Sequence, residues 1–348
     1  VGFGVDNHAV HAIMLLSIIW LEVIHLSRVV RPEKKPSAGL ATCVRVFFVE
    51  RYAMKMKLYG FQSTAVRNTV KEFKRADRAK VIMPCGTGKS LVGVHIVKKM
   101  VPKRSLIVAP SLALVKQLLD TYAEQGGLQR VMVVCSDDST AKEAREKFEI
   151  PGVTTDATLI ASELRKRSGI MVFSTYQSSP KIAAAFADGN LPAFDLAVFD
   201  EAHHMAGGSK IFTTALDDDR IKIRKRLFMT ATPRVATQSA KDQATEDGYE
   251  FASMDDEAQF GREAFYMSFN TAIDGDHLTD YQVAIFVVKE SEIQSMVDSD
   301  EDAKETAKRV ALIRAMQEHD IRKVLAYHRS VRQMNWFADI GLRKTFDA

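Results

Sequence analysis

The chain has 348 residues, of which 46% are hydrophobic and 26% are charged. This composition is that of a globular protein and excludes a disordered or collagen-like chain, and the length suffices for two domains. The formal net charge of +4 at pH 7 permits a polyanionic partner without requiring one. The chain has three cysteines, Cys43, Cys85 and Cys135, and they form no C-x-x-C pair. We therefore expect neither a zinc site nor a disulfide framework. A cytoplasmic location fits this cysteine usage.

Residues 1–55 differ in character from the rest of the chain. The segment 10–21 is mostly apolar, but a membrane span needs about 20 such residues, and Glu22 and His25 interrupt the run. We therefore expect no membrane segment here and a helix that is buried or packs on a partner. A linker rich in Pro and Lys follows at residues 31–39. Residues 1–55 are thus predicted to be an extension outside the folded enzyme.

From residue 57 onward, short apolar runs alternate with segments of helical periodicity. We expect helices at residues 62–74, 91–100, 112–124, 157–166 and 181–188, and strands at residues 80–83, 105–109, 131–135, 170–174, 196–199 and 226–229. Continuous apolar strands separated by helices predict an α/β fold with a parallel sheet flanked by helices. The basic segment 220–226 is interpreted first as an exposed approach to a strand, and the acidic segment 291–308 as a solvated helix or loop.

Ligands of such folds bind at the carboxyl ends of the strands. The expected strands place five residues at or just past these ends: Cys85, Pro110, Thr175, Asp200 and Thr230. They should therefore share one edge of the sheet.

The segment 81–90 (V-I-M-P-C-G-T-G-K-S) is typical of a phosphate-binding loop, although Met83 stands at the position of the first glycine. A strand, a loop containing Gly86, Thr87 and Gly88, and a helix N-terminus would together cradle an anionic phosphate. Lys89 is expected to reach the β- and γ-phosphates of a nucleotide, and the Ser90 hydroxyl to bind Mg²⁺. A chance Gly-Lys-Ser in a strand-to-helix turn is the alternative.

A second acidic motif, Asp200-Glu201-Ala202-His203, follows the expected strand at residues 196–199. One carboxylate at the sheet edge can hold the Mg²⁺ of a nucleotide, and the next can polarise a water for in-line attack on a γ-phosphate. An Asp-Glu pair is uninformative alone and becomes specific in combination with the phosphate-binding loop about 110 residues earlier.

Together these motifs resemble the superfamily 2 helicases of the DEAD/DEAH type, over about residues 57–348. The resemblance rests on several segments in the family's order: residues 58–62 (L-Y-G-F-Q, adenine side), 83–90 (motif I), 108–114 (V-A-P-S-L-A-L, motif Ia), 174–178 (S-T-Y-Q-S, nucleic-acid side), 200–203 (the DEAH box) and 230–232 (T-A-T, motif III). Within the superfamily the chain is most similar to restriction-type and helicase-associated-domain proteins. Four segments carry that narrower resemblance: residues 134–137, 153–156, 278–281 and 324–330, the last resembling motif IV.

The resemblance implies ATP and Mg²⁺ as cofactors and a role for each motif residue. Lys89 neutralises phosphate charge, Asp200 holds Mg²⁺ through water, Ser90 binds Mg²⁺ and Glu201 activates the attacking water. Gln62 contacts the adenine. The resemblance also implies that hydrolysis is coupled to domain movement by His203, Thr230 and Thr232. It implies that the nucleic-acid backbone is contacted by Ser111 and Thr175.

Some of these residues have simpler alternative roles. Thr230 and Thr232 could cap the following turn, and Ser111 could cap the helix at residues 112–124 or do both jobs. His204 is expected to be structural, and Cys85 to have no catalytic role. Tyr59 stands where the adenine-side segment usually has arginine.

The resemblance implies two RecA-like domains, which we expect at residues 56–248 and, incompletely, at 249–348. The family supplies an arginine finger from a Q-x-x-G-R-x-x-R motif in its second domain. Residues 259–262 (Q-F-G-R) imitate that motif but precede motif IV, so we reject them. Without the finger, the chain is expected to bind ATP weakly and to hydrolyse it slowly, and residues after about 248 to be disordered or to aggregate.

The sequence therefore predicts an ATP-dependent nucleic-acid helicase or translocase, with DNA rather than RNA as the expected nucleic acid. Two alternatives stay open. The chain could be a nucleotide-binding fragment without turnover, or the motor subunit of a restriction system whose partner is a nuclease or methyltransferase.

Overall fold

The computed structural model describes residues 9–13, 56–125, 130–135, 153–166, 169–187, 190–207, 210–246, 251–293, 300–321, 324, 326–327 and 330–337. The chain divides into two compact units, which are Pro32–Leu278 and Val1–Arg31 together with Thr279–Ala348. No helix among these described residues is long and apolar enough to cross a membrane.

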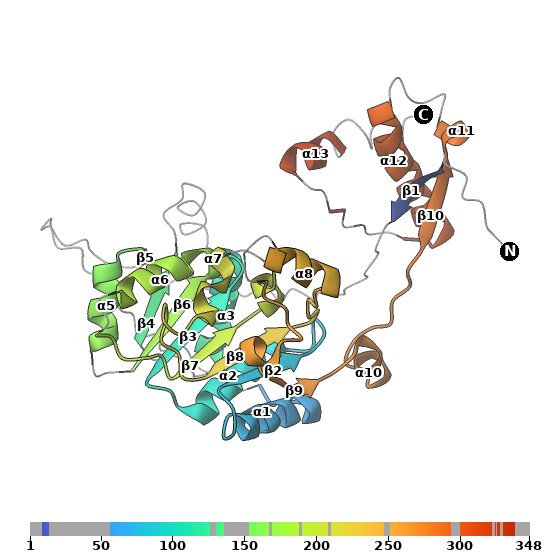
Figure 1. The fold of residues 1–348 in the computed structure, drawn as a ribbon. Helices are drawn as coiled ribbons and strands as arrows, with labels where there is room; N and C mark the ends of the chain where they lie inside the picture. Colours follow the sequence, from blue (N-terminus) through green and yellow to red (C-terminus); the bar gives the residue numbers. More distant parts are fainter. Residues whose placement is uncertain are drawn as a thin grey trace, which may run out of the picture. The chain divides into compact units, whose positions relative to one another are not determined.

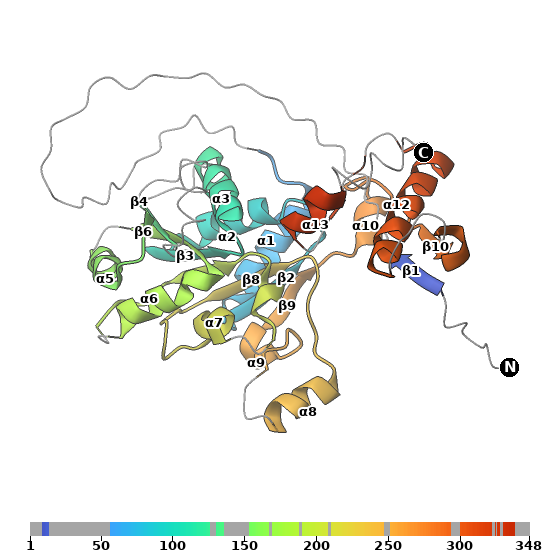
Figure 2. The same ribbon diagram turned by 90° about the horizontal axis from the view of Figure 1, so that it is seen from above.

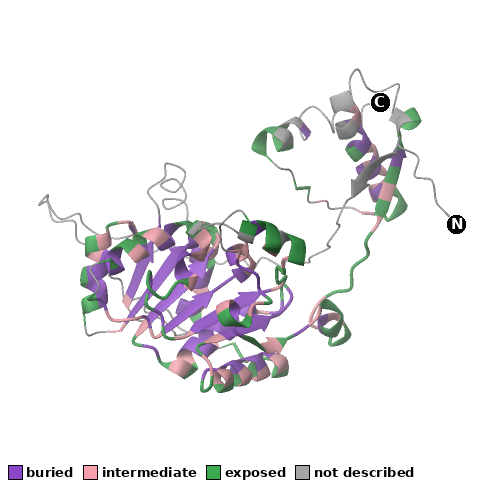
Figure 3. Ribbon diagram, in the orientation of Figure 1, coloured by how far each residue is buried: buried purple, intermediate pink, exposed green. Residues whose placement is uncertain are grey.

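The unit Pro32–Leu278 is built on a parallel sheet of eight described strands in the order β5-β4-β6-β3-β7-β8-β2-β9. The strands are β2 (Arg78–Ile82), β3 (Arg104–Ala109), β4 (Arg130–Val134), β5 (Val153–Thr154), β6 (Ile170–Thr175), β7 (Leu196–Phe199), β8 (Arg226–Thr230) and β9 (Arg262–Tyr266). Figure 3 shows that most of these strands are buried, as expected for a sheet covered on both faces. The predicted α/β fold with a helix-flanked parallel sheet is confirmed.

Helices cover both faces of this sheet (Figures 1 and 2). The described helices of this unit are α1 (Gly60–Glu72), α2 (Lys89–Met100), α3 (Leu112–Glu124), α5 (Ala157–Arg165), α6 (Ser179–Phe186), α7 (Lys210–Thr213), α8 (Gln238–Glu246), α9 (Glu257–Phe260) and α10 (Phe269–Asp274), with short 3₁₀ turns η1 (Tyr176–Ser178), η2 (Ala202–Met205) and η3 (Thr214–Leu216). Alternate residues of β3 enter two separate cores: Ile107 packs with α1–α3, and Leu106 and Val108 pack with α5 and α6. This period of two is the pleat of a strand buried on both faces.

The other unit contains an antiparallel pair of β1 (Ala9–Ile13) and β10 (Ile285–Lys289), together with α11 (Glu290–Ile293), α12 (Asp300–Glu318) and α13 (Val331–Trp336). Val288 of β10 packs with Ala307 and Ala311 of α12. The prediction of a helix at residues 10–21 is wrong for residues 10–13, because these belong to β1, which pairs with the backbone of β10. The rest of that prediction lies outside the described residues, as do residues 136–137, 325 and 328–329 of the predicted motifs.

The first unit extends to Leu278 and not to the expected boundary at residue 248. The reason is that β9 pairs in parallel with β2 and completes that edge of the sheet. Gly261 permits this approach: its φ is 72°, and a Cβ there would lie 2.2 Å from the backbone of Arg78. Phe260 is fully buried and Arg262 pairs with Glu257, so the rejected Q-F-G-R segment has a structural role.

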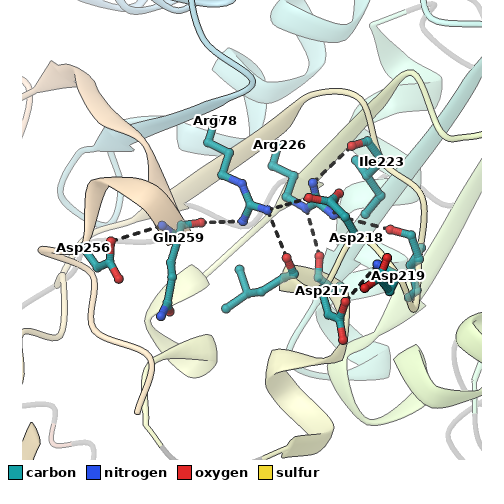
Figure 4. Close-up of polar contacts among 11 residues, drawn as sticks. Arg78, Asp217, Asp218, Asp219, Ile223, Arg226, Asp256 and Gln259 are labelled. Carbon is teal, nitrogen blue, oxygen red and sulfur yellow. Dashed lines mark hydrogen bonds and ion pairs between the residues drawn. The ribbon is translucent and has the colours of Figure 1, made fainter. Parts of the chain in front are cut away.

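The basic segment 220–226 is only partly exposed, contrary to the prediction, because Arg226 is 1% exposed. Its guanidinium donates to the carbonyl oxygens of Ala215 (2.9 Å) and Ile223 (3.1 Å) and pairs with Asp218 at 2.7 Å. Arg78 donates to the other oxygen of Asp218 at 3.1 Å (Figure 4). A buried charge needs such partners, and here they join the loop before β8 to the first residues of β2 and β8.

Candidate nucleotide-binding and hydrolysis site

The loop between β2 and α2 has the backbone geometry of a phosphate cradle. Gly86 and Gly88 have φ values of 84° and 80°, in the left-handed region that favours glycine. A Cβ on Gly88 would lie 2.5 Å from the Gln62 amide nitrogen, so a side chain there must displace Gln62. Thr87 closes the turn, its hydroxyl donating to the Pro84 carbonyl at 2.7 Å. The N-terminus of α2 therefore faces the space above the carboxyl end of β2, where an anion binds favourably.

Lys89, the first residue of α2, is 7% exposed and lies directly opposite the acidic motif. Its ammonium is 3.5 Å from the nearer carboxylate oxygen of Glu201 and 3.8 Å from the Cys85 sulfur. The structure thus brings together the predicted phosphate-binding lysine and the predicted base. Ser90 is half-buried in the same turn of α2. Nothing in the sequence indicated that the exposed Cys85 would contact Lys89.

Gln62 links the adenine-side segment to the phosphate loop. Its side-chain oxygen accepts from the Tyr59 backbone N–H at 2.9 Å, and its amide nitrogen donates to the Thr87 carbonyl at 2.8 Å. Gln62 is 3% exposed, and these two bonds leave one N–H and one lone pair of its amide for a contact with an adenine. Beside it, the exposed Tyr59 ring stacks on Phe61 at 5.8 Å, and His277 lies 4.5 Å from Phe61. Sequence reasoning missed His277, because only the fold brings it to this segment.

Asp200 carries a buried carboxylate oxygen that has no protein partner among the described residues. Its backbone is held firmly: the N–H donates to Val108 at 2.8 Å, and the carbonyl accepts from the Tyr176 hydroxyl at 2.7 Å. The pKa of Asp200 is raised to about 6, first by burial and then by the neighbouring Glu201 charge, while the Lys89 charge opposes the rise. An orphaned buried oxygen beside a phosphate cradle fits a Mg²⁺ ion or its water. Mg²⁺ in such sites takes few protein ligands and several from water and phosphate.

We expect Asp200→Asn to raise the melting temperature of the nucleotide-free chain at pH 7. The folded-state pKa of about 6 exceeds the ordinary 3.8, so ionisation of Asp200 opposes folding by about 3 kcal/mol at most. This cost is absent below about pH 4, grows as the pH rises through 6 and is complete near pH 7. Melting curves over this pH range should show the melting temperature of Asp200→Asn rising several degrees above that of the unsubstituted chain as the pH increases. Asp274→Asn, at an exposed position, is the control, and curves that stay parallel at every pH would contradict the expectation.

His203 connects the acidic motif to the T-A-T motif. Its Nδ1 lies 2.9 Å from the Thr230 hydroxyl and 3.4 Å from the second carboxylate oxygen of Glu201. The same Thr230 hydroxyl accepts from the Thr232 N–H at 3.2 Å, so the turn-capping alternative is observed alongside the contact with His203. Burial lowers the pKa of His203, and the neighbouring His204 lowers it further, which favours the neutral ring near pH 7. The three predicted coupling residues thus form one connected network.

The two predicted nucleic-acid contacts differ in exposure. Ser111 is exposed and caps α3, accepting from the Leu114 N–H at 3.3 Å. Thr175 is 6% exposed, and its hydroxyl lies 3.0 Å from that of the buried Ser178, so its side chain is turned inward. Within residues 175–178, Gln177 is the exposed residue, so its side chain is the one in this segment best placed for the predicted contact with a nucleic-acid backbone. The T-Y-Q pattern could have indicated Gln177, but nothing in the sequence indicates which of its three side chains is outside.

Comparison with known families gives an independent assignment. The family described as "Type III restriction enzyme, res subunit" (ResIII) matches residues 55–235, which is more than half of the chain. The matched segment includes the phosphate loop, both predicted nucleic-acid segments, the acidic motif and the T-A-T motif.

Curated relatives with similar sequences are viral. The chain is 26% identical over 288 residues to "Probable helicase A859L" of African swine fever virus (isolate Tick/South Africa/Pretoriuskop Pr4/1996), covering 81% of this chain and 30% of the relative. The same protein of strain Badajoz 1971 Vero-adapted is 29% identical over 236 residues, covering 67% and 24%. The chain therefore spans less than a third of the length of these relatives.

Among solved structures, the chain resembles "ATP-dependent Type ISP restriction-modification enzyme LlaBIII bound to DNA". The TM-score is 0.63 and the identity 24%, over 84% of this chain and 22% of that one. A nuclease-deletion mutant of the Type ISP enzyme LlaGI, in complex with a DNA substrate mimic, gives a TM-score of 0.55 and 26% identity, over 81% and 23%. These likenesses support the α/β fold described above.

Proposed function

Because this chain belongs to the ResIII family, whose model covers residues 55–235, we propose that it is the ATP-hydrolysing motor part of a DNA helicase or translocase of the DEAH type. The observation that carries the proposal is the meeting of three charged groups at one edge of the sheet. The Lys89 ammonium lies 3.5 Å from the Glu201 carboxylate. The residue before Glu201 is Asp200, whose buried carboxylate oxygen has no partner among the described residues. These are the groups that phosphoryl transfer to water requires.

Each group has a distinct task in the proposed reaction. Lys89 and the N–H groups at the start of α2 bind the β- and γ-phosphates. Ser90 and Asp200 would hold Mg²⁺, which supplies charge neutralisation on the phosphate oxygens. Glu201 orients a water for in-line attack and takes its proton. In the nucleotide-free chain the Glu201 carboxylate pairs with Lys89 and lies 3.4 Å from Nδ1 of His203, so phosphate binding must draw Lys89 away to release the carboxylate.

The proposed substrate is DNA, with Ser111 and the segment at residues 175–178 on the side that meets the strand. Support comes from the two similar restriction-modification enzymes, whose structures contain DNA or a DNA mimic. The same similarity favours a second candidate, the motor of a restriction system whose nuclease or methyltransferase lies in another subunit or domain.

The test is phosphate release by the 348-residue chain with Mg²⁺ and ATP, alone and with duplex DNA, single-stranded DNA or RNA of the same sequence. We expect DNA to raise the rate more than RNA does. Measurement in a single turnover, with protein in excess over ATP, detects even slow chemistry. Nucleotide binding with no phosphate release under any condition would establish the alternative of a binding fragment without turnover.

A further inference from the structure

The segment 175–178, which contains the last residue of β6 and the turn η1, joins the proposed DNA side of the unit to the acidic motif. It contains the buried pair Thr175 and Ser178, with the exposed Gln177 between them. Tyr176 belongs to the same 3₁₀ turn but points inward and is fully buried. Neighbouring residues of one short turn therefore face the solvent and the interior, which places the exposed Gln177 and the buried Tyr176 on adjacent peptide groups.

Tyr176 is held in a defined orientation by aromatic neighbours. Its ring stacks against Phe199 of β7, with centroids 6.5 Å apart, and meets Phe212 of α7 edge-on at 6.1 Å. Burial raises the pKa of Tyr176 well above its ordinary value, so the phenol remains a protonated donor. The hydroxyl uses that proton in a 2.7 Å hydrogen bond to the Asp200 carbonyl oxygen.

The peptide group that this bond holds lies directly before Glu201, whose backbone is strained. Glu201 has φ and ψ of 48°, a left-handed conformation that is unfavourable for a residue with a side chain. Such a conformation persists only where the surroundings enforce it. The Asp200 carbonyl is fixed by Tyr176, and the Glu201 carbonyl accepts from the His204 N–H at 3.1 Å. Rotation of the peptide between Asp200 and Glu201 would swing the Glu201 carboxylate.

We propose that Tyr176 is a positioning residue that couples DNA binding at residues 175–178 to the orientation of Glu201, through its hydrogen bond to the Asp200 carbonyl. This inference rests on the proposed function. Tyr176 touches neither the nucleotide nor the water in this scheme. It sets the backbone from which Glu201 projects, so its loss slows the chemical step and leaves nucleotide affinity unchanged.

The experiment compares Tyr176→Phe with Tyr122→Phe in the full chain. Both tyrosines are at most 1% exposed and both pack against a phenylalanine, but the Tyr122 hydroxyl has no partner among the described residues. With duplex DNA, Tyr176→Phe should lower the single-turnover rate at saturating ATP about five- to tenfold, the equivalent of one neutral hydrogen bond. The ATP concentration giving half the maximal rate should be unchanged, and Tyr122→Phe should retain the full rate.

Gln177→Ala tests the DNA side of the same turn at an exposed position where folding is not at risk. It should raise the duplex concentration needed for half-maximal stimulation. Three results overturn the proposal: a full rate in Tyr176→Phe, an equal loss in Tyr122→Phe, or an unchanged DNA requirement in Gln177→Ala. Failure of DNA to stimulate the unsubstituted chain is a different result, because it refutes the proposed function on which the inference rests.

Discussion

Replacing Lys89 with alanine is expected to abolish measurable Mg·ATP binding in a chain that begins near Met54. Lys89 is 7% exposed and sits at the N-terminus of α2, and its ammonium lies 3.5 Å from the Glu201 carboxylate. Loss of one partner from a desolvated charge pair typically costs about 2–5 kcal/mol, or roughly 30-fold to several thousand-fold in affinity. Calorimetric titration with Mg·ATP measures this loss directly.

The matched control for Lys89→Ala is Lys99→Ala, which removes the same charge from an exposed position of the same helix. It should bind Mg·ATP as the unsubstituted chain does, because its ammonium is solvated and distant along α2 from the glycine loop. Melting curves of both variants exclude a loss of fold. Equal nucleotide affinity in Lys89→Ala and the unsubstituted chain would remove the assignment of the loop as a phosphate cradle.

Replacing Glu201 with glutamine is expected to stop hydrolysis and preserve nucleotide binding. The amide keeps the shape of the side chain but cannot take a proton from water, and general-base catalysis typically contributes 10²–10⁴-fold. Asp200 keeps its charge and remains available to Mg²⁺. Because Glu201 also competes with phosphate for Lys89 at 3.5 Å, its neutralisation should leave ATP affinity equal or higher.

Single-turnover phosphate release and a parallel ATP titration separate the two effects of Glu201→Gln. Glu263→Gln, on an exposed position of β9 in the same sheet, is the control and should affect neither. Phosphate release at the original rate would mean that another residue activates the water. Loss of ATP binding together with hydrolysis would instead assign Glu201 a role in holding the nucleotide.

Much of the first unit could be predicted from its sequence because its strands are short, apolar and separated by helices of clear periodicity. The helix at residues 112–124 and the strand at residues 196–199 were predicted with the observed ends, since Ser111 caps the former and Asp200 follows the latter. The boundary at residue 248 was wrong because β9 has a half-exposed pattern with no strong signal of its own. Its place is decided by the open edge of β2 and by the freedom of Gly261.

The candidate site likewise has features that the sequence indicated and features that only the fold determines. The sequence indicated Lys89, Asp200 and Glu201, because a glycine loop between a strand and a helix and a later pair of carboxylates after a strand are specific in combination. The inward turn of Thr175 and the partnering of Tyr176 with the Asp200 carbonyl depend on contacts between distant segments. Neither contact could be predicted from composition or spacing.

The amino-acid sequence alone predicted the fold class and indicated the glycine loop and the charged residues of the candidate site, since these depend on local periodicity and on short motifs. Tertiary structure alone decided which of those groups meet, which are buried and which stay unpartnered. Burial and pairing are properties of segments far apart in the chain, as with Lys89 and Glu201, or Arg78 and Asp218. The raised pKa of Asp200 and the left-handed backbone of Glu201 follow from that packing, because desolvation and strain exist only once the sheet and its loops have assembled.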